Sequence, residues 1–168
     1  MRRVVAIGLT LALAACATRT TGPQLPPVEP AAPPPPPHLA VILGHGTYHT
    51  QAGAHGTCAG QSVALMRETT TYRRRIVALY GSSEHALLPV SEVQSRSAKL
   101  GQATENPLVD SAQCQSDGAF TFHDLQPGSY FLIARTHQGK AAPPAGEFVV
   151  MTRVVLNAGE YRNVDLTP

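Results

Sequence analysis

The chain has 168 residues, with 13 Lys and Arg against 11 Asp and Glu, a formal net charge of +2 and 43% hydrophobic residues. Two of the basic residues, Arg2 and Arg3, stand before an apolar run at the N-terminus, and 13 less these two leaves 11 against 11 in the rest. Proteins that bind nucleic acid carry a clustered basic face, so we exclude nucleic acid as a partner.

The first fifteen residues have the layout of an export signal. Arg2 and Arg3 precede an apolar stretch that ends in small residues. This stretch covers about a dozen residues, whereas a helix that spans a membrane needs about 20, so it is too short for a transmembrane anchor. We expect residues 1–15 to be removed as a signal peptide.

The sequence Leu13-Ala14-Ala15-Cys16 resembles the lipobox of bacterial lipoproteins. The resemblance implies that Cys16 carries a diacylglycerol and, after cleavage, a further fatty acid such as palmitate. Two or more acyl chains hold a protein firmly at a membrane. Ala17 stands where an Asp would indicate retention in the inner membrane. We therefore expect a protein of the cell envelope, anchored at the outer membrane with its domain outside the cytoplasm. The alternative is an ordinary signal with a chance cysteine.

Residues 16–38 predict a linker that follows the lipidated cysteine. The segment 22–37 is dominated by proline, which lacks an amide hydrogen and fixes φ, so neither a helix nor a central strand is expected. An extended spacer of this kind spans about 3 Å per residue, or roughly 45 Å. We expect it to hold the domain away from the membrane; the alternative is a proline-rich ligand for a binding groove.

The remaining residues, 39–168, predict one all-β domain. Short apolar and β-branched runs alternate with turns rich in Gly, Pro and Asn, which is typical of a sandwich or barrel. Asp117-Gly118 is a strong hairpin signal. The expected strands cover 39–43, 62–66, 119–122, 129–135, 147–150, 152–156 and 161–166.

Residues 71–81 interrupt this series of strands. An apolar face at helical spacing is formed by Tyr72, Ile76, Leu79 and Tyr80. Thr71 is the expected N-cap and Gly81 the expected C-cap. We predict one short inserted helix, followed by a long irregular connection over 82–106. Long ordered insertions of this kind often carry the function of a domain.

The sequence from 116 to 132 is similar to the signature of carboxypeptidase regulatory-like domains. An Asp-Gly turn is followed by Phe120-Thr121-Phe122 and then by the corner Pro127-Gly128-Ser129-Tyr130, and 154–166 looks like the last hairpin of the family. The resemblance implies an Ig-like or prealbumin-like (transthyretin-like) β-sandwich of about seven strands. Domains of this family assist, scaffold or bind. Phe120, Phe122 and Tyr130 have the character of core residues.

Lipidation of Cys16 leaves Cys58 and Cys114 as a pair in a compartment where disulfides persist. A bond between them would close a loop of about 55 residues and stabilise the fold by about 4 kcal/mol. The alternative is two separate buried thiols.

The sequence contains neither Gly-x-Ser-x-Gly nor His-Glu-x-x-His, and it has no glycine-rich phosphate loop. We therefore expect a non-enzymatic protein without a cofactor. His45, His49 and His55 are candidate ligands for Zn or Cu. On one extended strand the first two would share a face about 13 Å apart, too far to hold one metal without a bend. Exposed positions on an edge strand are the interpretation that we favour.

We expect a lipoprotein whose β-sandwich binds or scaffolds an envelope protein. The candidate binding residues lie on the inserted helix: Tyr72, Arg73, Arg74 and Tyr80. The arginines fit a solvated helix face or a site for phosphate or anionic glycan. The alternative function is a glycan- or peptidoglycan-binding module, suggested by the fold and by Tyr48, Tyr72 and Tyr80 taken as exposed. A metal site built from the histidines is the third.

Overall fold

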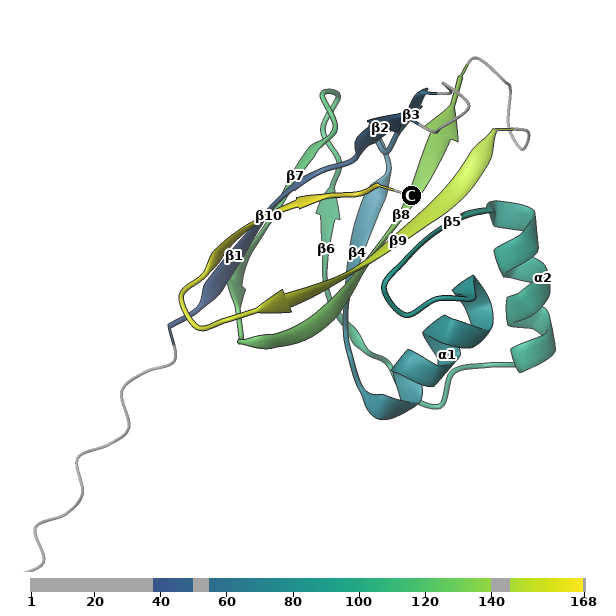
Figure 1. Cartoon of the computed structure of the whole chain (residues 1–168), viewed down its shortest axis with the longest axis horizontal. Helices are drawn as coiled ribbons and strands as arrows, with labels where there is room; N and C mark the ends of the chain where they lie inside the picture. The colour runs from purple at the N-terminus through teal and green to yellow at the C-terminus, as the bar shows by residue number, and fades with distance from the viewer. Residues whose placement is uncertain (1–37, 50–54, 140–145, 168) are drawn as a thin grey trace, which may run out of the picture. The chain divides into compact units, whose positions relative to one another are not determined.

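The computed structural model describes residues 38–49, 55–139 and 146–167 (Figure 1). The predicted signal peptide, Cys16 and nearly all of the linker lie outside these residues. The two helices of the described ranges are α1 (Thr70–Tyr80) and α2 (Val90–Leu100). The strands of these ranges are β1 (Ala40–His45), β2 (Thr47–His49), β3 (His55–Thr57), β4 (Ser62–Arg67), β5 (His85–Pro89), β6 (Leu108–Gln113), β7 (Ala119–Leu125), β8 (Gly128–Gln138), β9 (Glu147–Leu156) and β10 (Tyr161–Asp165).

The strands form two sheets that pack as a β-sandwich (Figure 1). In the three-stranded sheet, β1 lies between β10, to which it is parallel, and β7, to which it is antiparallel. The seven-stranded sheet is antiparallel and centred on β8, with β9 and β5 on one side and β4 and β6 on the other. The short strand β3 pairs beside the C-terminal end of β8, and β2 pairs with β3. The prediction of an all-β sandwich is confirmed, with more strands than the seven or so expected.

The core of the sandwich consists of apolar side chains on the facing sides of the two sheets. Phe120 and Phe122 of β7 are 3% and 1% exposed and pack in one cluster with Ile42 and Leu65. They share a face because side chains alternate along a strand, so their predicted place in the core is confirmed. A Cβ at Gly44 would lie 2.0 Å from the Phe120 ring, which explains why glycine occupies this inward position.

Residues 68–107, called the insertion below, connect β4 to β6, and its two helices cover the outer face of the seven-stranded sheet (Figure 1). Tyr72 and Ile76 of α1 pack against Phe131 and Met151 in a second hydrophobic cluster. The expected irregular connection over 82–106 was wrong, because this stretch contains β5 and α2. The helix α2 buries only Val90 and lacks a side-chain N-cap, so the local sequence holds no capping residue to mark its start.

Strands β8 and β9 are buried on both faces, because one face meets the other sheet and the other face meets the helices. Tyr130 and Leu132 belong to the sandwich core, whereas Phe131 belongs to the cluster under the helices. Two-sided burial explains the continuous apolar run in this part of the chain. It also explains why β9 is one strand where two were expected, since Met151 at the expected break packs under the helices.

The caps of α1 differ in part from those predicted. The side chain of Thr69, not Thr71, accepts a hydrogen bond from the backbone N–H of Tyr72 at 3.0 Å. Gly81 closes the helix with a φ of 78° and donates its backbone N–H to Val77, as expected. Neither helix of the described residues is long and apolar enough to cross a membrane.

Two predicted hairpins are turns that carry the chain from one sheet to the other. Asp117-Gly118 makes a tight turn, with the Asp117 carboxylate accepting the backbone N–H of Ala119 at 2.9 Å, but it joins β6 and β7 of different sheets. The closing segment also crosses between sheets after β9, because β10 pairs with β1 and not with β9. Local turn residues specify the reversal, whereas the strand partner is decided by the packing of the whole domain.

Cys58 and Cys114 form a disulfide with a Cα–Cα distance of 5.9 Å, and both residues are buried, so the predicted pairing is confirmed. The bond joins the segments that follow β3 and β6. The chain passes from β1 to β2 at Gly46, where a Cβ would lie 2.2 Å from the Cys58 sulfur. A side chain larger than hydrogen therefore does not fit beside the disulfide.

Tyr130 fixes the corner at Pro127-Gly128. Its ring is fully buried, and its hydroxyl donates to the Gln126 carbonyl at 2.6 Å and accepts from the Arg67 guanidinium at 2.9 Å. The same guanidinium lies 5.0 Å from the centre of the Tyr130 ring. The prediction that this tyrosine buries its ring and finds a partner for its hydroxyl is confirmed.

Candidate functional site

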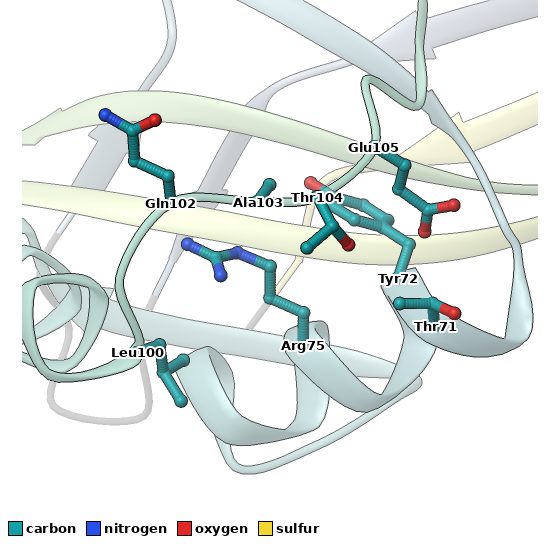
Figure 2. Close-up of a pocket in the computed structure, with 8 residues that line it drawn as sticks. All are labelled: Thr71, Tyr72, Arg75, Leu100, Gln102, Ala103, Thr104 and Glu105. Atoms are coloured by element: carbon teal, nitrogen blue, oxygen red, sulfur yellow. The ribbon is translucent and has the colours of Figure 1, made fainter.

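A small cleft of about 210 Å³ lies on the insertion, between the first half of α1 and the segment 100–105 that follows α2 (Figure 2). Its lining is Thr71, Tyr72, Arg75, Leu100, Gln102, Ala103, Thr104 and Glu105. Pockets that enclose a drug-sized ligand measure about 300–1,000 Å³, so this cleft fits only a small group.

The floor of the cleft is set by the start of α1. The N-cap Thr69 starts the helix at a defined residue, and helical geometry then places Thr71, Tyr72 and Arg75 along one side. Tyr72 is 7% exposed, because its ring also contacts Phe131 edge to face with a centroid distance of 6.1 Å. The part of Tyr72 that lines the cleft is therefore held by the hydrophobic cluster below it.

The opposite wall is the segment 100–105, which two polar contacts tie to the helix. The Arg75 guanidinium donates to the Gly101 carbonyl at 2.7 Å. The Thr69 hydroxyl donates to the Glu105 carboxylate at 2.6 Å. One hydroxyl thus caps the helix and also fixes the far end of the cleft.

The cleft holds one cation and one anion around a neutral phenol. Burial raises the pKa of the Tyr72 hydroxyl, the Arg75 cation works against this rise, and the Glu105 carboxylate adds to it. The hydroxyl therefore stays protonated at neutral pH, and it can both donate and accept a hydrogen bond. Arg75 can only donate and Glu105 can only accept.

The aromatic residues proposed for a glycan site are buried, which corrects the expectation that they are exposed. Tyr48, Tyr72 and Tyr80 are 3%, 7% and 7% exposed. The Tyr48 hydroxyl shares a hydrogen bond with the Thr136 hydroxyl at 2.8 Å inside the sandwich. The other two belong to α1 and pack between this helix and the sheet. Tyr72 and Tyr80 lie on the apolar face predicted for the helix, and this is the face that packs against the sheet. The exposed tyrosine of the described residues is Tyr161, at 74%.

The arginine run 73–75 divides among three surroundings, so the structure does not bring its members together. Arg73 donates to Glu68 at 2.8 Å, and Arg153 of β9 holds the other oxygen of Glu68 at 2.7 Å. Arg73 is therefore occupied by Glu68, and the Glu68 carboxylate joins α1 to β9 of the sheet. Arg74 is exposed on the outer side of the helix, and Arg75 enters the cleft.

The three histidines do not gather into one site. His45 donates to the Asp117 carbonyl at 3.0 Å and contacts Thr47. His49 and His55 face each other across β2 and β3, with ring centroids 5.0 Å apart. No group of three His, Cys, Asp or Glu residues suitable for a metal occurs in the described ranges. Gly46 separates His45 from His49, so the two do not share one continuous strand.

Sequence reasoning missed Glu105 as a functional candidate and left Arg75 without a separate role. Glu105 lies 36 residues beyond its partner Thr69, and nothing local in the sequence connects them. Arg75 carried a signal, since it falls three residues after Tyr72 on the predicted helix and therefore lies beside it. Cys16 lies outside the described residues, so its lipidation remains a prediction.

No model of a known protein family matches the chain, and no curated protein matches it. Two solved structures are similar in outline. One is PA1324 of Pseudomonas aeruginosa, a protein proposed to bind carbohydrate, with 18% identity, a TM-score of 0.49 and coverage of 79% of this chain and 90% of that one. The other is the SpaB basal pilin of Lactobacillus rhamnosus GG, with 17% identity, a TM-score of 0.39 and coverage of 79% and 96%. Neither similarity is close enough to carry a function or a site to this chain.

Proposed function

We propose that the protein is a non-enzymatic lipoprotein of the cell envelope, whose β-sandwich presents the insertion to a protein partner. The observation that carries the proposal is the place of the insertion. Strands β4 and β6 pair directly with each other, and antiparallel neighbours need only a few residues to connect them. This chain places the 40 residues from 68 to 107 between them.

The insertion presents a fixed surface. It has its own hydrophobic cluster against the sheet. Ion pairs also tie it to β9, because Arg153 contacts Glu68 at 2.7 Å and Glu84 at 3.6 Å. Arg96 of α2 donates to the Leu79 carbonyl of α1 at 2.9 Å, which joins the two helices. A surface ordered in advance loses little conformational entropy when it binds.

The outer side of α1 supplies the candidate contact surface, called the α1 surface below and formed by Arg74, Val77 and Ala78. These three residues are exposed and lie on one side of the helix, with Val77 45% exposed. Exposed apolar groups beside a cation suit a partner that offers apolar and acidic side chains.

Charge within the insertion supports an acidic partner. Three of its four glutamates pair with arginines within the described residues: Glu68, Glu84 and Glu92. The fourth, Glu105, accepts from the neutral Thr69 hydroxyl. Arg74, Arg75 and Lys99 have no carboxylate partner within the same residues, so three cations stand against the one unpaired carboxylate of Glu105. The charge left for a ligand on this layer is therefore positive.

The proposed anchor is Cys16, and the proline-rich segment serves as its spacer. A spacer of roughly 45 Å leaves the domain room to reach an envelope protein beside the membrane. Metabolic labelling with a palmitate analogue should mark the protein in cells, and Cys16→Ser should abolish the label and release the protein from the membrane fraction. A label that persists in Cys16→Ser would contradict the anchor.

Cross-linking in living cells, followed by detergent extraction, pull-down and mass spectrometry, tests the partner. We expect one envelope protein at near-stoichiometric yield, with recovery reduced at least fivefold by Val77→Glu because a charge enters the apolar contact. Arg162→Glu, on the three-stranded sheet, is the matched control and should leave recovery unchanged. Recovery of no stoichiometric protein, or equal recovery with Val77→Glu, would overturn the proposal.

A further inference from the structure

We propose that the cleft between α1 and the segment 100–105 is a binding site for one uncharged sugar ring. The observation behind it is that Arg75 and Glu105, with a buried tyrosine between their charges, line a cleft too small for a larger ligand. This site is separate from the α1 surface proposed for the protein partner, and it does not depend on that partner.

The hydrogen-bonding groups of the cleft suit a ring of hydroxyls. A sugar hydroxyl donates one hydrogen bond and accepts others, so a good site mixes donors with acceptors. Arg75 supplies donors and Glu105 an acceptor. Gln102 and Thr104, which are exposed on the wall of the cleft, supply groups that do both. Leu100 and Ala103 provide apolar surface for the C–H face of the ring.

The charge of the lining selects an uncharged ligand. Arg75 and Glu105 are the two charged residues of the lining, and their charges cancel. A carboxylate on the ligand would be attracted by Arg75 but repelled by Glu105. An ammonium group would be attracted by Glu105 but repelled by Arg75. A neutral hydroxyl can bond either group without this conflict, and hydrogen bonds to charged groups are stronger than those between neutral ones.

The lining is held in place before a ligand binds. Arg75 is oriented by the Gly101 carbonyl at 2.7 Å, and Glu105 by the Thr69 hydroxyl at 2.6 Å. Each of these contacts leaves further capacity for a ligand, because a guanidinium has five N–H groups and a carboxylate has two oxygens. Groups fixed in advance are not reordered at binding, which favours even a small ligand.

The test is an NMR titration of the ¹⁵N-labelled full chain with the methyl glycosides of glucose, galactose and N-acetylglucosamine. Glucuronic acid and glucosamine serve as charged probes. We expect at least one neutral glycoside to shift the amide signals of 71–75 and 100–105, with a dissociation constant on the order of a few millimolar for so small a ligand. Glu105→Gln should weaken binding about tenfold, because it removes a charged acceptor.

Three further variants keep the result interpretable. Thr104→Val removes one exposed hydroxyl, which makes no hydrogen bond within the described residues, and it should weaken binding without affecting the fold. Glu92→Gln removes a carboxylate that pairs with Arg96 outside the cleft, and Tyr161→Ala removes the exposed ring of the other sheet; both should bind as the wild type does. The proposal is wrong if no neutral glycoside binds, if only the charged sugars bind, or if Tyr161→Ala abolishes binding while Glu105→Gln does not. None of these outcomes bears on the cross-linked partner protein.

Discussion

Single side chains in this protein often hold two elements at once. Thr69 caps α1 and holds Glu105, and Glu68 bonds Arg73 of α1 and Arg153 of β9. Tyr130 occupies the sandwich core and closes the corner before β8. Substitution of such a residue removes contacts in two places, so its effect on stability is larger than its exposure suggests.

Tyr80 gives the fold a dependence on high pH. Burial raises the pKa of its hydroxyl, and the nearby Tyr72 phenol adds to the rise. Above pH 10 the unfolded chain loses this proton while the folded chain keeps it. The contribution to stability is therefore complete below pH 10 and declines as the pH rises, by about 1.4 kcal/mol per pH unit for one such group.

Chemical denaturation between pH 8 and pH 11 tests this effect. The free energy of unfolding should fall above pH 10, and Tyr80→Phe should make the decline shallower while folding at pH 8. Tyr161→Phe, at a position that is 74% exposed, should leave the slope as in the wild type. Identical slopes for Tyr80→Phe and the wild type would contradict the assignment.

At the scale of elements, the N-cap of α1 could not be identified from the sequence and required the structure. The sequence contains Thr69, Thr70 and Thr71 in a row, and each has the side chain of an N-cap. Which of them caps depends on where β4 ends and on the position of Glu105, and neither is visible in the local sequence. The end of the helix was predictable, because Gly81 is the one residue there suited to a positive φ.

Two threonine variants test this difference. Thr69→Ala should lower the free energy of unfolding by about 1–2 kcal/mol, because the helix loses its cap and Glu105 loses a hydrogen bond. Thr71→Ala, on an exposed side chain, should change it by less than about 0.5 kcal/mol. Thermal or urea unfolding followed by circular dichroism measures both values. A larger effect of Thr71→Ala would show that the cap is misassigned.

Other elements show the same limit of local patterns. The runs 62–66, 119–122 and 129–135 predicted strands correctly, since their apolar side chains are buried against the opposite sheet. The unbroken apolar run of β8 also indicates that both faces of this strand are covered. The one helix that was predicted accounts for only part of the layer on the outer face, because α2 belongs to it as well. Strands β2 and β3 have only three residues each, and their hydrogen bonds to neighbouring strands define them. Segments this short have no apolar alternation from which they could be predicted.

At the scale of the whole molecule, the sandwich and its disulfide were predictable, and the arrangement of the cleft was not. Cys58 and Cys114 could be paired by counting, because three cysteines less the one predicted to carry lipid leave two. The cleft joins residues of α1 to a segment some 30 residues later through the contacts of Arg75 and Thr69. Long-range contacts of this kind depend on how α1 and α2 pack on the sheet, and a single sequence does not show that.

The molecule as a whole combines a sandwich and its ordered insertion with a lipid anchor and a proline-rich spacer that are both predictions from the sequence. The proposed anchor would restrict the domain to the membrane surface, so a partner in the same envelope would meet it at a raised effective concentration. Modest affinity at the α1 surface is then enough for a stable association in cells, even if the isolated domain binds weakly.

Site-specific photo-cross-linking in living cells tests the central claim most directly. A photoreactive amino acid at position 77, on the α1 surface, should give one covalent adduct of defined mass with an envelope protein. The same amino acid at position 161, exposed on the three-stranded sheet, should give none. No adduct from position 77, or the same adduct from both positions, would contradict the account of the insertion as the partner-binding surface.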